Sequence, residues 1–452
     1  MVKVQRLSEF QHAFSFSDQT ERFDEFYHRF LQSDLGKIHQ GVPWDSLVRS
    51  FGLSDSAKGP DSIFSPKGKI ALMFLKHYGC CSDRRLIEQL NGNLEWQFFC
   101  DLHLGTARIE NFKIVSDIRC DLAKKLDMKE VEQVLYGHWS AFMDNKESVT
   151  VDATCYESHL RYPTTVKLLW ECVDWLYGKM ELLCSLLGVK LPRTKYLKWK
   201  KRYVGYSKMR RKTKNKRRAL TRSLLRLLSK LNGIMDGLED GCGITFAPNY
   251  HRRRATAKKV FEQRDAYFNQ DIKPKDRIVS LDRPYIRPIV RGKEIKAVEF
   301  GAKVNKLQID GISFIEHLSF DAFHEGNRLI DTIFRAQQLT HVKTKVVGGD
   351  AIYATNKNRN FITKHGIRTD FKRKGRATKH EKQRRQMAAA ITKERASRLE
   401  GSFGKDKEHY HLKRIRARTK KTEILWIFFG IHTGNALEIG RRIARADHLL
   451  AA

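Results

Sequence analysis

The chain has 452 residues, enough for about three domains of ordinary size or one elaborated two-domain enzyme, which excludes a single small module. Its hydrophobic content of 41% excludes wholesale disorder. Lys and Arg number 86 against 51 Asp and Glu, a formal net charge of +35. A charge that large exceeds what solubility requires and indicates a polyanionic partner. No window approaches 18 uninterrupted apolar residues, so we expect no membrane partner.

The N-terminal region, residues 1–145, is typical of a helical domain. Lys67–Tyr78 is apolar enough for a buried helix, Gly79 interrupts it, and Ser82 can cap a second helix that ends at 91–93. Two further helices are expected at 111–126 and 129–142. Helix, short turn, helix is the outline of a helix-turn-helix unit, but any helical bundle gives it. DNA binding and plain packing both stay open for this region.

The pattern changes to strands after residue 146. Ser148–Ala153 (SVTVDA) is a β-rich run, and further strands are expected at 277–281, 297–304, 311–320 and 344–350. The strands at 297–304 and 311–320 are predicted to form a hairpin. Helices are expected at 323–339, through Glu400, and at 424–431. Strands followed by helix, strand and helix indicate a mixed α/β domain over 146–452.

A helical insertion is expected after the first strand, at about 165–240. Leu169 to Leu187 and Leu220 to Leu238 each carry apolar residues spaced alternately by four and three. This spacing predicts two amphipathic helices that pair as an antiparallel hairpin.

The connection between these two helices is strongly basic. From Arg193 to Lys230 there are 17 Lys and Arg and no acid. A run of one sign repels itself unless a polyanion neutralises it, which predicts a DNA contact. Its centre is the basic cluster Arg210, Arg211, Lys212, Lys214, Lys216, Arg217 and Arg218. Aromatic residues at 196, 199, 203 and 206 could stack on bases or pack in a core, and the sequence leaves both open.

Three carboxylates stand out as candidates for chemistry. Asp152 and Asp350 each end an apolar strand, where α/β sheets present their sites, and Glu400 lies on an otherwise basic helix. Each alone has an ordinary role as a cap or a salt-bridge partner. Together they make sense as ligands of Mg²⁺ or Mn²⁺, because converging carboxylates need a counter-charge. Two such ions about 4 Å apart support in-line phosphodiester displacement.

At these residues the sequence resembles the bacterial insertion-sequence transposases of the DDE type. Asp152, Asp350 in DxxY with Tyr353, and Glu400 in RxxxxExxFGxxK match the three acidic positions of that family. Residues 65–142 also resemble the helical N-terminal domain of such enzymes. The resemblance implies a helical N-terminal DNA-binding domain at 1–145 and an RNase H-like catalytic domain at 146–452 that carries the insertion.

The resemblance also implies a function. Such an enzyme cleaves the inverted-repeat ends of its element with two Mg²⁺ or Mn²⁺ ions and joins the 3′-hydroxyl to target DNA. Asp152, Asp350 and Glu400 would be the catalytic and metal-binding residues. Arg395, Lys407 and Arg398 would hold phosphates, and Tyr353 would touch the DNA or pack nearby. The partner would be double-stranded DNA, bound by a homodimer or larger assembly, and the location cytoplasmic at the nucleoid.

One departure from the family pattern concerns the arginine before Glu400. Related elements often carry Arg four residues before the Glu, where this chain has Ala396, so Arg395 and Arg398 are the available substitutes. Three other functions are also consistent with the strongly basic composition. They are an RNase H-like nuclease or resolvase without strand transfer, a non-catalytic DNA-binding protein, and an RNA-binding protein. The ordered set of three acids favours the transposase.

Overall fold

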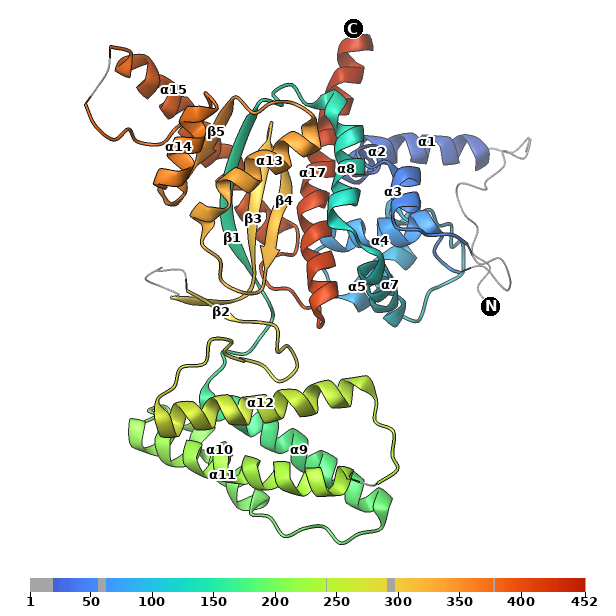
Figure 1. Cartoon of the computed structure of the whole chain (residues 1–452). Coiled ribbons are helices and arrows are strands. Elements are labelled where there is room, and N and C mark those ends of the chain that lie inside the picture. The colour runs from blue at the N-terminus through green and yellow to red at the C-terminus, as the bar shows by residue number, and fades with distance from the viewer. Residues whose placement is uncertain (1–18, 56–61, 241, 291–296, 377–378, 452) are drawn as a thin grey trace. The chain divides into compact units, whose positions relative to one another are not determined.

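The computed structural model describes residues 19–55, 62–240, 242–290, 297–376 and 379–451 (Figure 1). The chain divides into two compact units. The first unit comprises Met1–Ser158, Ala302–Ser319 and Phe323–Ala452, and the second comprises His159–Gly301 and Phe320–Ala322. The N-terminal helices and the main sheet therefore share one unit. The domain boundary near residue 145 stays a prediction.

The first unit begins with a set of helices. They are α1 (Gln19–Gln32), α2 (Asp34–Gln40), α3 (Trp44–Ser50), α4 (Pro66–Tyr78), α5 (Asp83–Gly92), α6 (Leu94–Phe99), α7 (Lys113–Lys125) and α8 (Met128–Trp139), followed by the 3₁₀ turn η2 (Ser140–Phe142). The predicted helices of this region are confirmed. Helix α4 ends at Gly79, and the Ser82 hydroxyl accepts a hydrogen bond from the Arg85 amide at the start of α5.

The first unit contains a mixed sheet with the strand order β4-β3-β1-β5-β6. Its strands are β1 (Ser148–Glu157), β3 (Val298–Ile309), β4 (Ile312–Ser319), β5 (Val346–Gly349) and β6 (Arg368–Thr369). Strands β3 and β4 form the predicted hairpin, and β5 runs parallel to both β1 and β6. The mixed α/β fold is RNase H-like, as the resemblance implied.

Two sets of helices complete the first unit. The 3₁₀ turn η3 (Glu325–Asn327), α13 (Leu329–Thr340), the 3₁₀ turn η4 (Ala351–Tyr353) and α14 (Asn356–Lys364) form one set. The other comprises α15 (Glu381–Glu394), the π-helical η5 (Arg395–Glu400), α16 (Gly401–His409) and α17 (Lys420–Ala451). Helix α17 is much longer than the predicted 424–431. Glycines let it approach α2, because a Cβ at Gly440 would meet the Lys37 carbonyl oxygen. None of the helices in the described ranges is both long and apolar enough to cross a bilayer.

The second unit is a helical bundle made of α9 (Thr165–Leu187), α10 (Tyr196–Lys208), α11 (Lys214–Glu239) and α12 (Pro248–Gln270), with β2 (Pro288–Val290) on the first residues of β3. Both predicted amphipathic helices are confirmed as α9 and α11, and their apolar seams form one core. The aromatic residues of the basic run join that core, which favours packing over base stacking for them.

The helices of the bundle are arranged differently from the simple antiparallel pair that the sequence predicted. The Tyr196 ring lies 3.7 Å from Tyr177, and the Tyr203 ring lies 4.8 Å from Trp170, so α10 runs back along α9. Helix α11 follows after a short connection and therefore runs in the same direction as α9 (Figure 1). Part of the basic run forms the helix α10 because its aromatic residues pack against α9.

The strand predicted at 277–281 is wrong. Side chains of α12 satisfy the backbone there: the Gln263 side chain accepts from the Ile278 amide at 3.1 Å, and Arg264 donates to the Ile278 carbonyl at 2.9 Å. A β-ladder is therefore not needed to bury this apolar segment.

A buried carboxylate on α8 connects four elements of the first unit. Glu132 is 0% exposed. Its side chain accepts hydrogen bonds from the Ile315 amide on β4 at 2.7 Å and from Arg335 on α13 at 3.0 Å. The His432 ring on α17 lies 3.3 Å from the same carboxylate. Removing this acid would leave Arg335 buried beside unsatisfied groups, which is costly in a low-dielectric interior.

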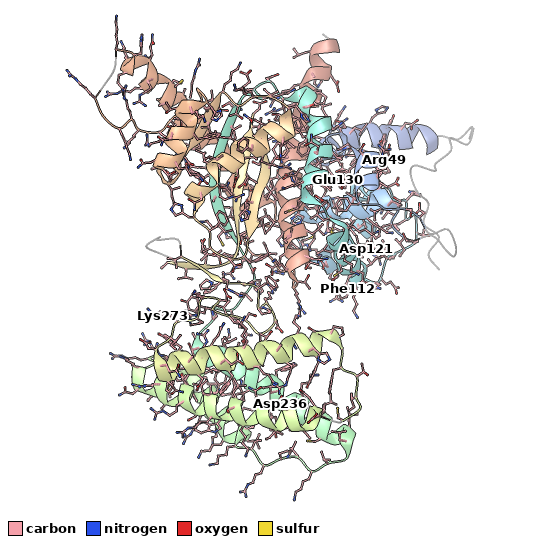
Figure 2. All side chains as sticks on the ribbon, in the orientation of Figure 1. Arg49, Phe112, Asp121, Glu130, Asp236 and Lys273 are labelled. Atoms are coloured by element: carbon pink, nitrogen blue, oxygen red, sulfur yellow. The ribbon has the colours of Figure 1, made fainter. Side chains whose placement is uncertain are left out.

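We therefore expect Glu132→Ala to lower the free energy of unfolding by about 3–5 kcal/mol, the usual cost of breaking a buried ion pair. Glu130→Ala is the matched control, because Glu130 lies on α8 but is exposed (Figure 2). Urea unfolding followed by circular dichroism measures both variants. Equal stabilities for the two would contradict the structural role of Glu132.

Candidate active site

The two predicted strand-end carboxylates lie on neighbouring parallel strands. Strands β1 and β5 pair with Val151 opposite Gly349, so Asp152 and Asp350 each follow a paired residue. Adjacent strands are about 4.8 Å apart, which puts these two residues side by side. Asp350 is exposed, and its carboxylate accepts a hydrogen bond from the Ala351 amide at 2.6 Å at the start of η4.

The environment of Asp152 is unfavourable for its negative charge. Burial raises the pKa of Asp152 to about 6, and the charges of Glu325 and Asp350 act in the same direction. The Arg395 guanidinium opposes this rise. A carboxyl held near neutrality in this way gains most from an additional cation close by.

Glu400, the third predicted carboxylate, is held by Arg395 in a π-helical segment. Arg395 Nη1 lies 2.9 Å from Glu400 Oε1, and the two residues are five apart, the repeat of a π-helical hydrogen bond. In an α-helix, side chains four apart are the neighbours. The wider turn therefore explains how Arg395 reaches Glu400 although the two residues are five apart.

Helix α16, which follows Glu400, is docked on the face of β1 that carries Asp152. Lys306 on β3 is fully buried and lies 2.7 Å from Asp406 of α16. The Tyr156 hydroxyl donates to the same carboxylate at 2.5 Å. Lys407 donates to Thr154 at 3.1 Å, two residues along β1 from Asp152. Alternate residues of a strand share one face, so Lys407 and Asp152 lie on the same side of β1.

Two acidic residues near these carboxylates, Glu325 and Asp370, were missed by the sequence reasoning. Glu325 of η3 influences Asp152 electrostatically and lies 2.7 Å from Lys303. Asp370 follows β6, accepts a hydrogen bond from the Gly349 amide at 3.1 Å, and lies 3.8 Å from Arg395. Asp370 carried the same signal as the other two aspartates, an acid after a strand, but β6 is too short to recognise. Glu325 carried no signal, because only the fold brings it to β1.

The other predicted DNA contacts have different environments. Tyr353 is fully buried and donates to Asn305 at 2.6 Å, which favours packing. Arg398 is 49% exposed and lies 3.2 Å from Asp310. In the second unit, Arg210, Arg211, Lys212, Lys214, Lys216, Arg217 and Arg218 are all exposed, in the connection before α11 and its first turns.

The carboxylates of Asp152, Asp350 and Glu400 do not form a complete metal site in this structure. Within the ranges that the structure describes, no three His, Cys, Asp or Glu side chains are grouped closely enough to hold an ion. Arg395 instead provides the positive charge beside Asp152 and Glu400. The residues nonetheless suit a divalent cation. Asp152 and Asp350 offer hard oxygen donors on adjacent strands, and their negative charges are only partly compensated by nearby cations.

Two family models match the chain. One, described as a transposase DDE domain, matches residues 347–430, from β5 into α17, and so includes Asp350 and Glu400. The other, described as a transposase domain (DUF772), matches residues 16–121 in the helical N-terminal region. Together these two matches support an insertion-sequence DDE transposase. No curated protein and no solved structure gives a significant match.

The raised pKa of Asp152 in this transposase predicts a pH-dependent stability. The native state holds this proton more tightly than the unfolded chain, whose ordinary pKa is 3.8, so ionisation costs stability as the pH rises through about 6. In EDTA, we expect Asp152→Asn to become more stable than the wild type between pH 4 and 6 and to keep that advantage at pH 7. Urea unfolding across this range measures it, with Glu130→Gln as the charge-matched control. Parallel profiles for Asp152→Asn and the wild type would contradict the prediction.

Proposed function

We propose that this transposase cleaves DNA strands at the inverted-repeat ends of its element and transfers the 3′-hydroxyl to target DNA, with Asp152, Asp350 and Glu400 as its catalytic acids. The parallel pairing of β1 and β5 carries the proposal, because it makes Asp152 and Asp350 neighbours. That adjacency lies on an RNase H-like sheet in a chain of this family.

Mg²⁺ or Mn²⁺, when bound, would supply the activation of a water or 3′-hydroxyl and the neutralisation of the leaving oxygen. Asp152 and Asp350 would hold the cations from adjacent strands. Glu400 would join them from η5 once it exchanges its ion pair with Arg395. Two ions are proposed because in-line displacement has an entering and a leaving oxygen to stabilise.

Basic residues of the first unit would orient the scissile strand. Arg395 is 13% exposed and is released by the same exchange that frees Glu400, so its guanidinium would pass to a phosphate. Lys407, on the Asp152 face of β1, would hold a second phosphate. These contacts position the DNA and do not read its sequence. A dimer or larger assembly would act on the two ends, and the protein would work in the cytoplasm at the nucleoid.

The decisive test uses a labelled duplex carrying the DNA that flanks the gene. With Mg²⁺ or Mn²⁺ we expect nicked and joined products, and with EDTA we expect none. Nicking without joining would instead favour an RNase H-like nuclease or resolvase. Binding without any nicking would favour a non-catalytic DNA-binding protein.

The three acids can be tested separately from binding. Asp152→Asn, Asp350→Asn and Glu400→Gln should each abolish nicking while DNA affinity stays similar or rises, because a lost carboxylate removes repulsion from phosphate. Gel-shift titration of the same proteins measures the affinity. Loss of DNA binding in all three variants would argue that the acids are structural.

The basic cluster of the second unit should contact the DNA backbone. Replacing Arg210, Arg211 and Lys212 by Gln should weaken binding and flatten its dependence on salt, by about one unit of log-log slope per lost phosphate contact. Lys273 and Lys275, which lie outside this cluster, offer a control when replaced in the same way. An unchanged slope would mean that the cluster does not touch DNA.

A further inference from the structure

The turn between β3 and β4 carries a carboxylate with an unusual number of partners. The turn residues Asp310 and Gly311 have φ angles of 48° and 80°, a conformation that favours Asp, Asn and Gly. The Asp310 side chain is 11% exposed. Beside the turn, Gln308 donates to Ser313 across the hairpin at 3.1 Å. The carboxylate therefore lies on a hairpin turn that a side-chain hydrogen bond braces.

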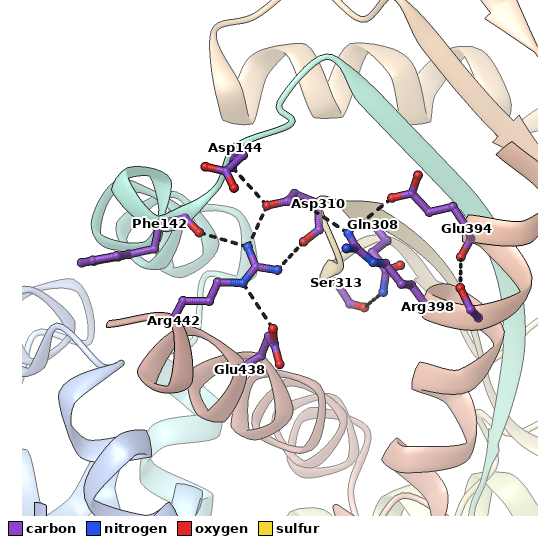
Figure 3. Close-up of polar contacts among 10 residues, drawn as sticks. Phe142, Asp144, Gln308, Asp310, Ser313, Glu394, Arg398, Glu438 and Arg442 are labelled. Atoms are coloured by element: carbon purple, nitrogen blue, oxygen red, sulfur yellow. Dashed lines mark hydrogen bonds and ion pairs between the residues drawn. The ribbon is translucent and has the colours of Figure 1, made fainter. Parts of the chain in front are cut away.

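Two elements hold the Asp310 carboxylate in place. Arg442 of α17 donates to its Oδ2 at 2.7 Å and to the Asp310 carbonyl oxygen at 2.7 Å. The Asp144 amide donates to the same Oδ2 at 3.1 Å. Arg442 is itself fixed, because it also donates to the Phe142 carbonyl at 3.0 Å and to Glu438 at 3.2 Å (Figure 3).

The remaining oxygen of this carboxylate faces the π-helical segment. Arg398 Nη1 lies 3.2 Å from Asp310 Oδ1 and 3.4 Å from Glu394 (Figure 3). Arg398 stands two residues before Glu400 and next to Leu399, which is fully buried. A π-helical turn is rarer than an α-helical one and is retained where its surroundings support it. Leu399 anchors this segment by packing and Arg398 anchors it by charge.

We infer that Asp310 is a positioning residue, which through Arg398 holds the π-helical segment 395–400 in the register that places Glu400 beside Arg395. The inference rests on the proposed function for its catalytic consequence, and on the contacts of Asp310 for the anchoring itself. It also assigns Arg398 a partner within the protein, in addition to any phosphate it meets.

The substitution Asp310→Asn separates charge from backbone conformation. Asparagine tolerates a positive φ and still accepts hydrogen bonds, so the turn should persist. The attraction to Arg398 is lost, because an amide carries no charge. Arg398→Gln removes the same ion pair from the other side, together with the contact to Glu394, and leaves the turn untouched. Glu438→Gln is the matched control, since it removes a carboxylate bonded to Arg442 that makes no contact with Arg398.

The anchoring is measured by amide hydrogen exchange in the free protein, which needs neither metal nor DNA. We expect Asp310→Asn and Arg398→Gln to speed exchange in residues 395–409, while the core of α17 and the Glu438→Gln protein stay as in the wild type. The effect of the double variant should be smaller than the sum of the two single effects, because the two substitutions share the Asp310–Arg398 ion pair. Unchanged exchange in 395–409, or equal acceleration in Glu438→Gln, would overturn the inference.

The catalytic consequence is measured with the nicking assay. Asp310→Asn should lower the nicking rate by about tenfold to a hundredfold at fixed Mn²⁺, the effect of a small misplacement of a reacting group, with DNA affinity unchanged. Raising Mn²⁺ should restore part of the rate, which a general loss of folding would not allow. Altered exchange with wild-type nicking would overturn the positioning role. If the wild type shows no nicking, the proposed function is contradicted. The hydrogen-exchange measurement then still tests whether Asp310 anchors the segment.

Discussion

The buried ion pair between Lys306 and Asp406 fixes the relation between the sheet and the helix that follows Glu400. Lys306 is completely buried on β3, and Asp406 also accepts from Tyr156 on β1. Such a charge is tolerated inside a protein only when it is paired and hydrogen-bonded. Helix α16 can therefore dock in few registers, and the positions of Lys407 and Glu400 depend in part on this contact.

On the other face of the sheet, the neighbouring residue Asn305 likewise attaches other elements to β3. Asn305 is buried, donates to Thr332 on α13, and accepts from the Tyr353 hydroxyl just after Asp350. Successive residues of a strand point to opposite faces, so Asn305 and Lys306 each attach a different element. The segments that bear Asp350 and Glu400 are thus both tied to β3, although neither acid lies on it.

Charge balance at the site depends on Arg395. It faces Asp152, pairs with Glu400 and lies near Asp370, so one guanidinium compensates several carboxylates. A divalent cation could take over that compensation and release Arg395 toward a phosphate. The π-helical turn would make this exchange possible, because residues 395 and 400 face each other across it.

The sequence by itself determined four helices of the N-terminal region, the β3–β4 hairpin, both amphipathic helices of the insertion and the positions of Asp152 and Asp350 at strand ends, whereas the adjacency of these two acids came from the pairing of β1 with β5. These features follow from local periodicity and from strands that end in acids, which neighbouring residues along the chain decide. Only the tertiary structure decided the π-helical pairing of Arg395 with Glu400, the approach of Glu325 to Asp152 and the return of α10 along α9. Each of these depends on contacts between distant segments, and such contacts leave no periodic pattern in the chain. The segment 277–281 is a further example. Its composition predicted a strand, but side chains of the distant helix α12 form the hydrogen bonds of its backbone instead.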